Sequence, residues 1–158
     1  SGVSSNKALV TNKLSSDIRL MHSYLISLGS NTHDAPQQLQ QAFRWLASIG
    51  TLCKVSHIYT TPDIKNPQAP PYHNAVALVE CDREHDAMNA LTKEYEHSMH
   101  REHGTGRVII DLDVVTCDNE VLRPRDYTAT YFVIGLHALT APDFCPGLFR
   151  NISLSNPV

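Results

Sequence analysis

The chain has 158 residues, of which 42% are hydrophobic and 18% are charged, a composition typical of one soluble globular domain. Thirteen Lys and Arg against sixteen Asp and Glu give a formal net charge of −3, so there is no domain-wide positive field to bind a nucleic acid. No apolar run approaches the roughly 20 residues that cross a bilayer, which excludes a membrane span.

The first twenty residues differ from the rest of the chain. They are rich in Ser, Asn and Lys and lack a continuous apolar core, so we do not expect them to be a secretory signal. We expect residues 1–20 to be disordered or foreign to the natural protein, and residues 21–158 to form a single domain. The four cysteines form no CxxC pair and are too few for a disulfide scaffold, which favours reduced thiols in the cytoplasm. Nothing indicates a dimer contact, and we expect a monomer.

From Tyr24 onward the apolar pattern is regular. The run at 24–28, stopped by Gly29, predicts a buried strand. Apolar residues then recur at helical spacing from Leu39 to Leu46, which predicts a helix from about Asp34, as N-cap, to Gly50. Further along we expect strands at 52–59, 72–81 and 108–117, a helix at 86–101 and a last helix at 130–141.

The resulting order from Tyr24 to Cys117 is β-α-β-β-α-β. This order predicts a ferredoxin-like α+β fold, in which an antiparallel sheet carries both helices on one face, followed by a C-terminal helix. Between the second and third strands, four prolines in residues 60–71 predict an ordered loop. A loop of this length in a compact domain is more often functional than idle.

Two aspartates in the fourth strand are the strongest indication of chemistry. Asp111 and Asp113 share one face of that strand, with their Cα atoms about 6.5–7 Å apart, and such carboxylates repel each other unless a cation joins them. Magnesium takes one or two carboxylates together with phosphate oxygens. The alternative is a solvated outer face of the sheet. We also expect both helices to pack on the opposite face, leaving the carboxylates at the mouth of a cleft.

Three other features carry weaker indications. His97, His100 and His103 could bind a transition metal, but steps of three residues spread them too far around a helix for one tetrahedral centre. The glycines at 104 and 106, with Arg107, could approach a phosphate, although such loops are common connectors. Tyr72 and Asn74 point to the same side of the third strand, which suits a flat heterocycle or simply a polar sheet surface.

Taken together, the segments resemble the hydroxymethyldihydropterin pyrophosphokinase family of folate biosynthesis from about Tyr24 to Pro142. The matching strings are YLISLGSN at 24–31, VSHIYTTP at 55–62, YHNAVALVE at 72–80, Glu96 with Arg101, and IIDLDVV at 109–115. The resemblance implies transfer of pyrophosphate from ATP to the hydroxymethyl group of 6-hydroxymethyl-7,8-dihydropterin, with release of AMP. It implies small-molecule substrates only, with ATP as co-substrate and two Mg²⁺ ions as cofactor.

The same resemblance implies roles for individual residues. Asp111 and Asp113 would hold the metal ions and would be catalytic together with Arg101 and Arg107. The pterin would be bound by Thr61, Pro62, Ile64, Tyr72, Asn74 and Phe132, with its ring between Tyr72 and Phe132. ATP would be bound by Glu96, Arg101, Arg107 and Val114.

The departures from the family pattern gather on the ATP side. The stretch 102–110 is about three residues shorter than the family's arginine-rich loop and lacks its tryptophan, and Arg107 lies four residues before Asp111 instead of three. His103, Arg125 and Thr130 replace an arginine, a histidine and an arginine of the family; Arg123 or Arg125 could supply the missing charge. A non-catalytic pterin- or nucleotide-binding module on the same fold is the main alternative, and a metal-binding interaction domain built on the histidine-rich helix is a weaker one.

Overall fold

The computed structural model describes residues 21–103 and 108–140, without the side chains of residues 101–103. Along the chain its elements are β1 (His22–Ser30), α2 (Ala35–Ile49), β2 (Thr51–Val55), β3 (Tyr59–Thr61), β4 (Tyr72–Cys81), α3 (His85–His103), β5 (Asp111–Cys117), β6 (Glu120–Val121), α4 (Pro124–Tyr127) and α5 (Thr130–Thr140). The expected N-terminal extension, residues 1–20, lies outside the described residues, as do residues 141–158.

One antiparallel sheet organises these elements. Its strands follow the order β2-β4-β1-β5-β6, and the short β3 also pairs with β4. The two strands that lie next to each other in the middle, β1 and β4, are far apart in sequence, as the β-α-β-β-α-β order requires. The predicted ferredoxin-like α+β fold is therefore confirmed.

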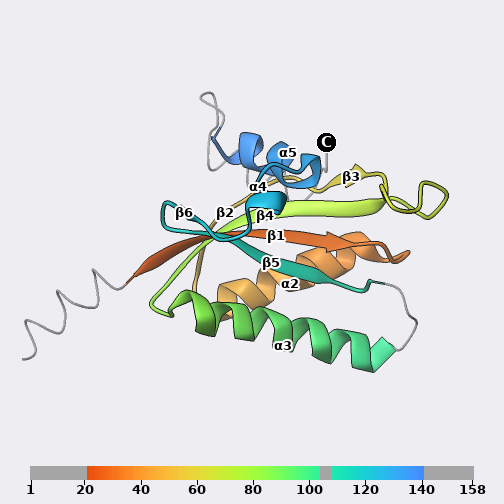
Figure 1. Ribbon diagram of the computed structural model, residues 1–158. Helices are drawn as coiled ribbons and strands as arrows, with labels where there is room; N and C mark the ends of the chain where they lie inside the picture. The colour runs from red at the N-terminus through yellow and green to blue at the C-terminus, as the bar shows by residue number, and fades with distance from the viewer. Residues whose placement is uncertain (1–20, 104–107, 141–158) are drawn as a thin grey trace, which may run out of the picture.

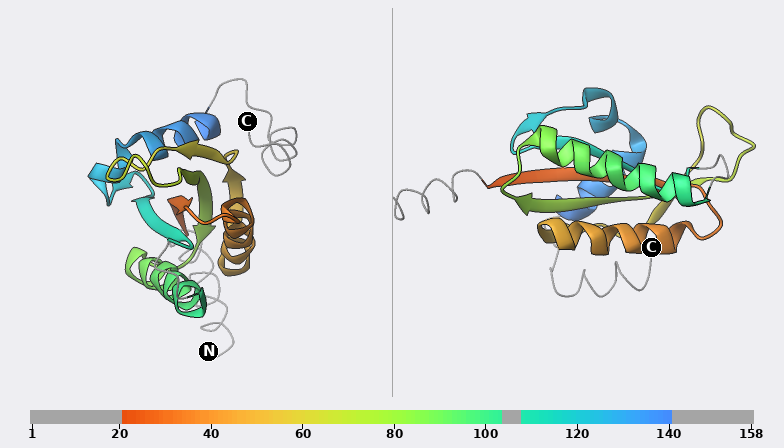
Figure 2. Two further views of the ribbon diagram at one scale, coloured as in Figure 1. Left: turned by 90° about the vertical axis from the view of Figure 1, so that its right-hand side faces the viewer. Right: turned by 90° about the horizontal axis from the view of Figure 1, so that it is seen from below.

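Each face of the sheet is covered by different helices. Leu112 and Val114 of β5 point to the face on which α2 and α3 pack, and there they join the main core with Leu39 and Met88. On the other face α5 packs over a smaller cluster that contains Val76 and Phe132. Figures 1 and 2 show α2 and α3 on one side of the sheet and α4 and α5 on the other. Both predicted helices thus lie on the face opposite Asp111, as expected.

Several boundaries differ from the expectation. The predicted strand at 52–59 is split into β2 and β3 at Ser56, whose side-chain oxygen accepts a hydrogen bond from the backbone N–H of Val76 at 2.8 Å. The strand predicted at 108–117 begins at Asp111 in the structure, as β5. The short β6 and α4 were not expected. Asp34 does occupy the N-cap position of α2, but its carboxylate accepts hydrogen bonds from the side chains of Thr32 and Gln38 and not from the helix backbone.

Helix α5 is held against the sheet by one close approach. A Cβ atom on Gly135 would lie 2.4 Å from Cγ2 of Val76, so only glycine lets the helix come this near to β4. The hydroxyl of Tyr59 in β3 donates to the backbone oxygen of Tyr131 and accepts from the backbone N–H of Gly135. These bonds fix the first turns of α5 beside the strand ends that carry the candidate site.

Candidate active site

A cavity of about 320 Å³ opens on the face of the sheet covered by α5, next to the Pro-rich loop. This volume is in the range of small-molecule sites. Its lining comes from four strands (β1, β3, β4 and β5), from α5 and from the segment that follows β3. It comprises Ser27, Gly29, Thr61, Pro62, Asp63, Ile64, Lys65, Tyr72, Asn74, Asp111, Asp113 and Tyr131. The loop after β3 thus forms one wall of the cavity.

The floor of the cavity holds a fixed amide group. The Thr61 hydroxyl donates to Oδ1 of Asn74 at 2.6 Å, which leaves the amide nitrogen as the donor that Asn74 can offer. Gly29 lies opposite Asn74 across β1 and β4, and a Cβ at that glycine would be 3.2 Å from the amide nitrogen. The missing side chain therefore keeps the space above the amide open, with the Tyr72 ring alongside.

Three carboxylates meet beside this floor. Asp111 and Asp113 leave β5 on the cavity side, and Glu96 reaches the same place from α3. One oxygen of each lies within 4.8 Å of the others, so the three could hold a metal ion. The backbone N–H of Leu112 donates to Glu96 at 2.6 Å and thereby fixes the helix side chain against the strand. An all-oxygen set of this kind suits a hard cation such as Mg²⁺.

The carboxylate group carries more negative charge than its surroundings favour. Desolvation in the cavity wall and the neighbouring charges of Asp113 and Glu96 raise the pKa of Asp111 to about 6. Part of the excess charge is neutralised by the ammonium group of Lys93, which lies 3.0 Å from both Asp113 and Glu96. A divalent cation would relieve the same repulsion more completely.

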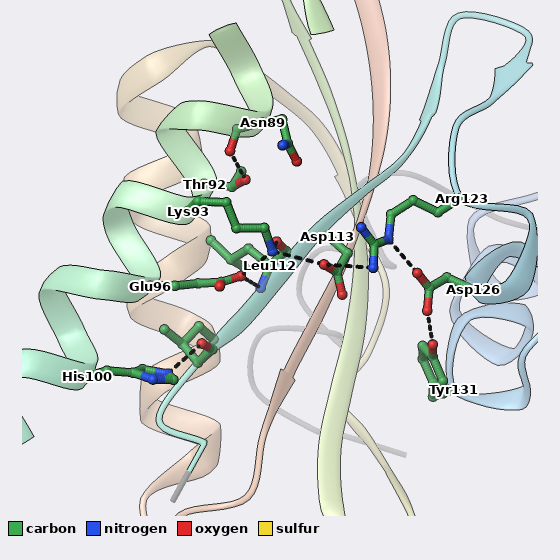
Figure 3. Close-up of polar contacts among 11 residues, drawn as sticks. Asn89, Thr92, Lys93, Glu96, His100, Leu112, Asp113, Arg123, Asp126 and Tyr131 are labelled. Carbon is green, nitrogen blue, oxygen red and sulfur yellow. Dashed lines mark hydrogen bonds and ion pairs between the residues drawn. The ribbon is translucent and has the colours of Figure 1, made fainter. Parts of the chain in front are cut away.

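A second positive group approaches from the opposite side. Nη2 of Arg123 lies 3.6 Å from Asp113, and its Nε donates to Asp126, which in turn accepts a hydrogen bond from the Tyr131 hydroxyl. Figure 3 shows this continuous line of polar contacts from Lys93 on α3, across β5, to Tyr131 on α5. Of the two arginines named as replacement charges, Arg123 is the one that contacts a carboxylate of the group.

Most of the residues expected at a substrate site come together in the structure. Thr61, Pro62, Ile64, Tyr72, Asn74, Asp111 and Asp113 all line the cavity, and Glu96 joins the two aspartates. Two others lie elsewhere: Phe132 is fully buried in the cluster beneath α5, and Val114 is in the core on the opposite face. Arg107 and the Arg101 side chain lie outside the described residues.

Several lining residues were not anticipated. The most important is Tyr131, which lines the cavity where Phe132 was expected. Outside the lining, the contact of Lys93 with the carboxylates was not anticipated either. Ser27 and Gly29 could have been found, because they share one face of β1 and are small or polar in an otherwise apolar run. The histidine-rich helix gives no metal site in the described region: His97 and His100 belong to no cluster of metal-binding side chains there, and His100 contacts the backbone oxygen of Ile110.

The sequence matches a known protein family. Residues 25–142, about three quarters of the chain, match the family model described as 7,8-dihydro-6-hydroxymethylpterin-pyrophosphokinase. The match spans all the residues of the cavity and of the carboxylate group. No curated protein matches the chain. Among the described residues, no helix is both long and apolar enough to cross a membrane.

Proposed function

The chain belongs to the 7,8-dihydro-6-hydroxymethylpterin-pyrophosphokinase family, and we propose that Glu96, Asp111 and Asp113 hold the magnesium ions of its reaction. The reaction is the transfer of pyrophosphate from ATP to the hydroxymethyl group of hydroxymethyldihydropterin in folate biosynthesis. The observation that carries the proposal is the meeting of three carboxylates at the edge of a cavity with a fixed amide and an aromatic ring.

In this proposal the pterin occupies the cavity. Its flat ring lies over Gly29, with the Asn74 amide donating to the ring edge, since Thr61 holds the carbonyl of that amide and leaves its nitrogen to the ligand. Tyr72 forms one aromatic wall and Tyr131 a second one, the role that the sequence assigned to Phe132. In the proposal the hydroxymethyl group points toward Asp111 and Asp113, which line the same cavity.

The carboxylates and the side chains of Lys93 and Arg123 act on the triphosphate in this proposal. Magnesium held by Glu96, Asp111 and Asp113 would neutralise phosphate charge and orient the reacting groups. Lys93 and Arg123 flank Asp113 from opposite sides, and in the proposal both cations would contact phosphate oxygens of the metal-bound nucleotide. They supply part of the positive charge that the shortened loop before β5 lacks. Phosphoryl transfer of this kind works mainly by positioning and charge stabilisation, and it needs no separate general base.

The test is release of AMP from ATP by the full chain in the presence of Mg²⁺, with and without hydroxymethyldihydropterin. We expect AMP only when the pterin is present, and loss of the activity when Mg²⁺ is removed by a chelator and its return when Mg²⁺ is restored. AMP formation without pterin contradicts the assignment of the cavity. Tight pterin binding by calorimetry that Mg²⁺ and an ATP analogue do not strengthen, with no AMP formed, would instead identify a non-catalytic pterin-binding module.

The proposal extends to the state of the protein in the cell. We infer that the enzyme acts as a monomer in the cytoplasm, where its thiols stay reduced. Cys53, Cys81 and Cys117 are free in the described part of the chain, whereas Cys145 lies outside it. Sedimentation analysis tests the first statement: a single species at the mass of one chain, 17.6 kDa, is expected, and a stable dimer contradicts it.

A further inference from the structure

A second group of metal-binding side chains lies at the other end of the sheet. His22 begins β1, while Cys117 ends β5 and Asp118 follows it in the turn to β6. One nitrogen, one sulfur and one oxygen of these residues lie within 4.8 Å of one another. In Figure 1 this end, with the start of β1 and with β6, lies opposite the Pro-rich loop that borders the cavity.

The distances are close to those of a tetrahedral metal centre. Oδ2 of Asp118 lies 2.9 Å from Nδ1 of His22 and 3.8 Å from Sγ of Cys117. Zinc bonds of about 2.0 Å to nitrogen and oxygen and about 2.3 Å to sulfur separate such atoms by roughly 3.3 and 3.5 Å. Two of the three separations therefore lie within about 0.4 Å of those around a bound ion, and the third, between the His22 ring nitrogen and the Cys117 sulfur, is below 4.8 Å.

The surroundings orient two of the three ligands. The other carboxylate oxygen of Asp118 accepts a hydrogen bond from the backbone N–H of Ser23 at 3.0 Å, so Oδ2 is the oxygen turned toward His22 and Cys117. On the far side of the His22 ring, Nε2 is buried without a hydrogen bond, and Oε1 of Glu84 lies 3.6 Å from it. Metal-binding histidines commonly give their second ring N–H to a carboxylate, and Glu84 stands in that place.

We propose that His22, Cys117 and Asp118 form a binding site for a borderline transition-metal ion, with Zn²⁺ as the best match. A thiolate and an imidazole favour such an ion over Mg²⁺, for which the all-oxygen group at the cavity is suited. Binding releases the proton of the Cys117 thiol and leaves the His22 ring proton on Nε2, which donates a hydrogen bond to the Glu84 carboxylate. The ion ties the start of β1 to the end of β5, segments 95 residues apart in sequence, and so acts as a structural clamp.

The site can be tested with metal alone. Co²⁺ is added to the metal-free full chain in the presence of excess Mg²⁺, which occupies the carboxylates at the cavity, and the absorption due to thiolate-to-cobalt charge transfer is followed. We expect one equivalent of Co²⁺ to produce this band and one equivalent of Zn²⁺ to abolish it. Absence of the band, or a band that needs many equivalents, overturns the proposal.

Two substitutions and a matched control identify the ligands. We expect Cys117→Ser to remove the band and to weaken Zn²⁺ binding by more than about 100-fold, the upper end of what loss of an outer partner costs. Cys81→Ser is the control, because Cys81 is an equally buried thiol, opposite His22 on β4, outside the group. Survival of the band in Cys117→Ser would show that Cys117 is not the thiolate ligand and would overturn the proposal. Loss of the band in Cys81→Ser, with the native melting curve retained, would do the same.

The second substitution guards against a folding defect. His22→Gln puts a polar side chain in the place of the imidazole ring. We expect this variant to lose the rise in melting temperature that Zn²⁺ gives the unsubstituted chain. Its metal-free melting temperature and far-ultraviolet spectrum should stay near those of the parent. An undiminished Zn²⁺-dependent rise contradicts a role for His22. Because the proposed magnesium group is at the opposite end of β5, failure of this test leaves the AMP-release result untouched, and the converse also holds.

Discussion

The two ends of β5 carry different ligand chemistry on a single strand. At its start Asp111 and Asp113 join Glu96 in an all-oxygen group, and two cations stand beside them. At its end Cys117 and Asp118 join His22 in a mixed group that hydrogen bonds hold together, and among the described residues no Lys or Arg forms an ion pair with it. Four residue steps of strand, from Asp113 to Cys117, separate the two groups by about 13 Å. The comparison teaches that the donor atoms, and not the strand that carries them, decide which cation each end can bind.

The largest effect is expected from removing a carboxylate at the cavity end. Asp113→Asn should lower the rate of AMP release by at least about 100-fold, the scale of losing a principal electrostatic stabiliser of the transition state. Glu120→Gln is the matched control, since Glu120 is an exposed acid at the other end of the same strand pair and outside both groups. An activity of Asp113→Asn within tenfold of the parent would mean that the carboxylate group is not the catalytic metal site.

The next effect belongs to the other end. Glu84→Gln should weaken Zn²⁺ binding by roughly 10-fold, at the low end of the range for outer partners because the Glu84 side chain is 68% exposed. The amide keeps the size of the side chain but accepts a weaker hydrogen bond from the His22 ring N–H. Competition with a coloured zinc chelator measures the change. Unaltered affinity would mean that Glu84 only lies near the ring, and AMP release is expected to stay at the parent level in this variant.

Lys93 should have opposite effects on the two ligands of the cavity end. It competes with the metal ion for the carboxylates, and it helps to bind the phosphates of the nucleotide. Lys93→Met removes the positive charge 3.0 Å from Asp113, and it should therefore raise the affinity for Mn²⁺ alone. The expected gain is roughly fivefold, from about 1 kcal/mol for a charge that is 42% exposed to solvent. The affinity for ATP alone should fall at the same time, because a cation for its phosphates is lost.

Calorimetric titrations of Mn²⁺ and of ATP, done separately, measure both directions. Arg44→Gln serves as control, since it removes an exposed positive charge from α2, away from the carboxylates. Changes of the same sign for the two ligands would show that Lys93 acts only through the stability of the fold.

The sequence predicted the parts of this site that depend on strand alternation. Asp111 and Asp113 share a face, as do Tyr72 and Asn74, because side chains alternate along a strand whatever its neighbours are. Helix contacts were harder to foresee. Residues 131–136 of α5 are apolar except for the tyrosine hydroxyl, so the pattern shows no polar face, and it could not tell that Tyr131 lines the cavity while Phe132 is buried.

Contacts between distant segments were beyond the sequence for a different reason. The approach of Lys93 and Glu96 to β5 depends on how α3 crosses the edge of the sheet, which no local pattern records. The meeting of His22 with Asp118 depends on the register of β1 with β5, including an irregularity between Leu25 and Ile26. The split between β2 and β3 likewise results from a bond that Ser56 makes with β4.

The smallest effect is expected at Asp126, which holds Arg123 toward the cavity end. Burial opposes ionisation of Asp126, but hydrogen bonds from Tyr131 and Arg123 outweigh it and hold the pKa of this carboxyl below its usual 3.8. A depressed pKa contributes stability above pH 3.8, and that stability is lost as the pH falls through the lower, folded-state value.

Asp126→Asn should therefore melt about 2–4 °C below the parent near pH 7, for a loss of about 1 kcal/mol in a domain of this size. The difference should shrink as the pH falls below 3.8. Asp82→Asn, an exposed acid after β4, is the control and should follow the parent at every pH. A difference that stays constant with pH would assign Asp126 a packing role, and a simultaneous loss of Zn²⁺ binding would show that the two ends of β5 are coupled.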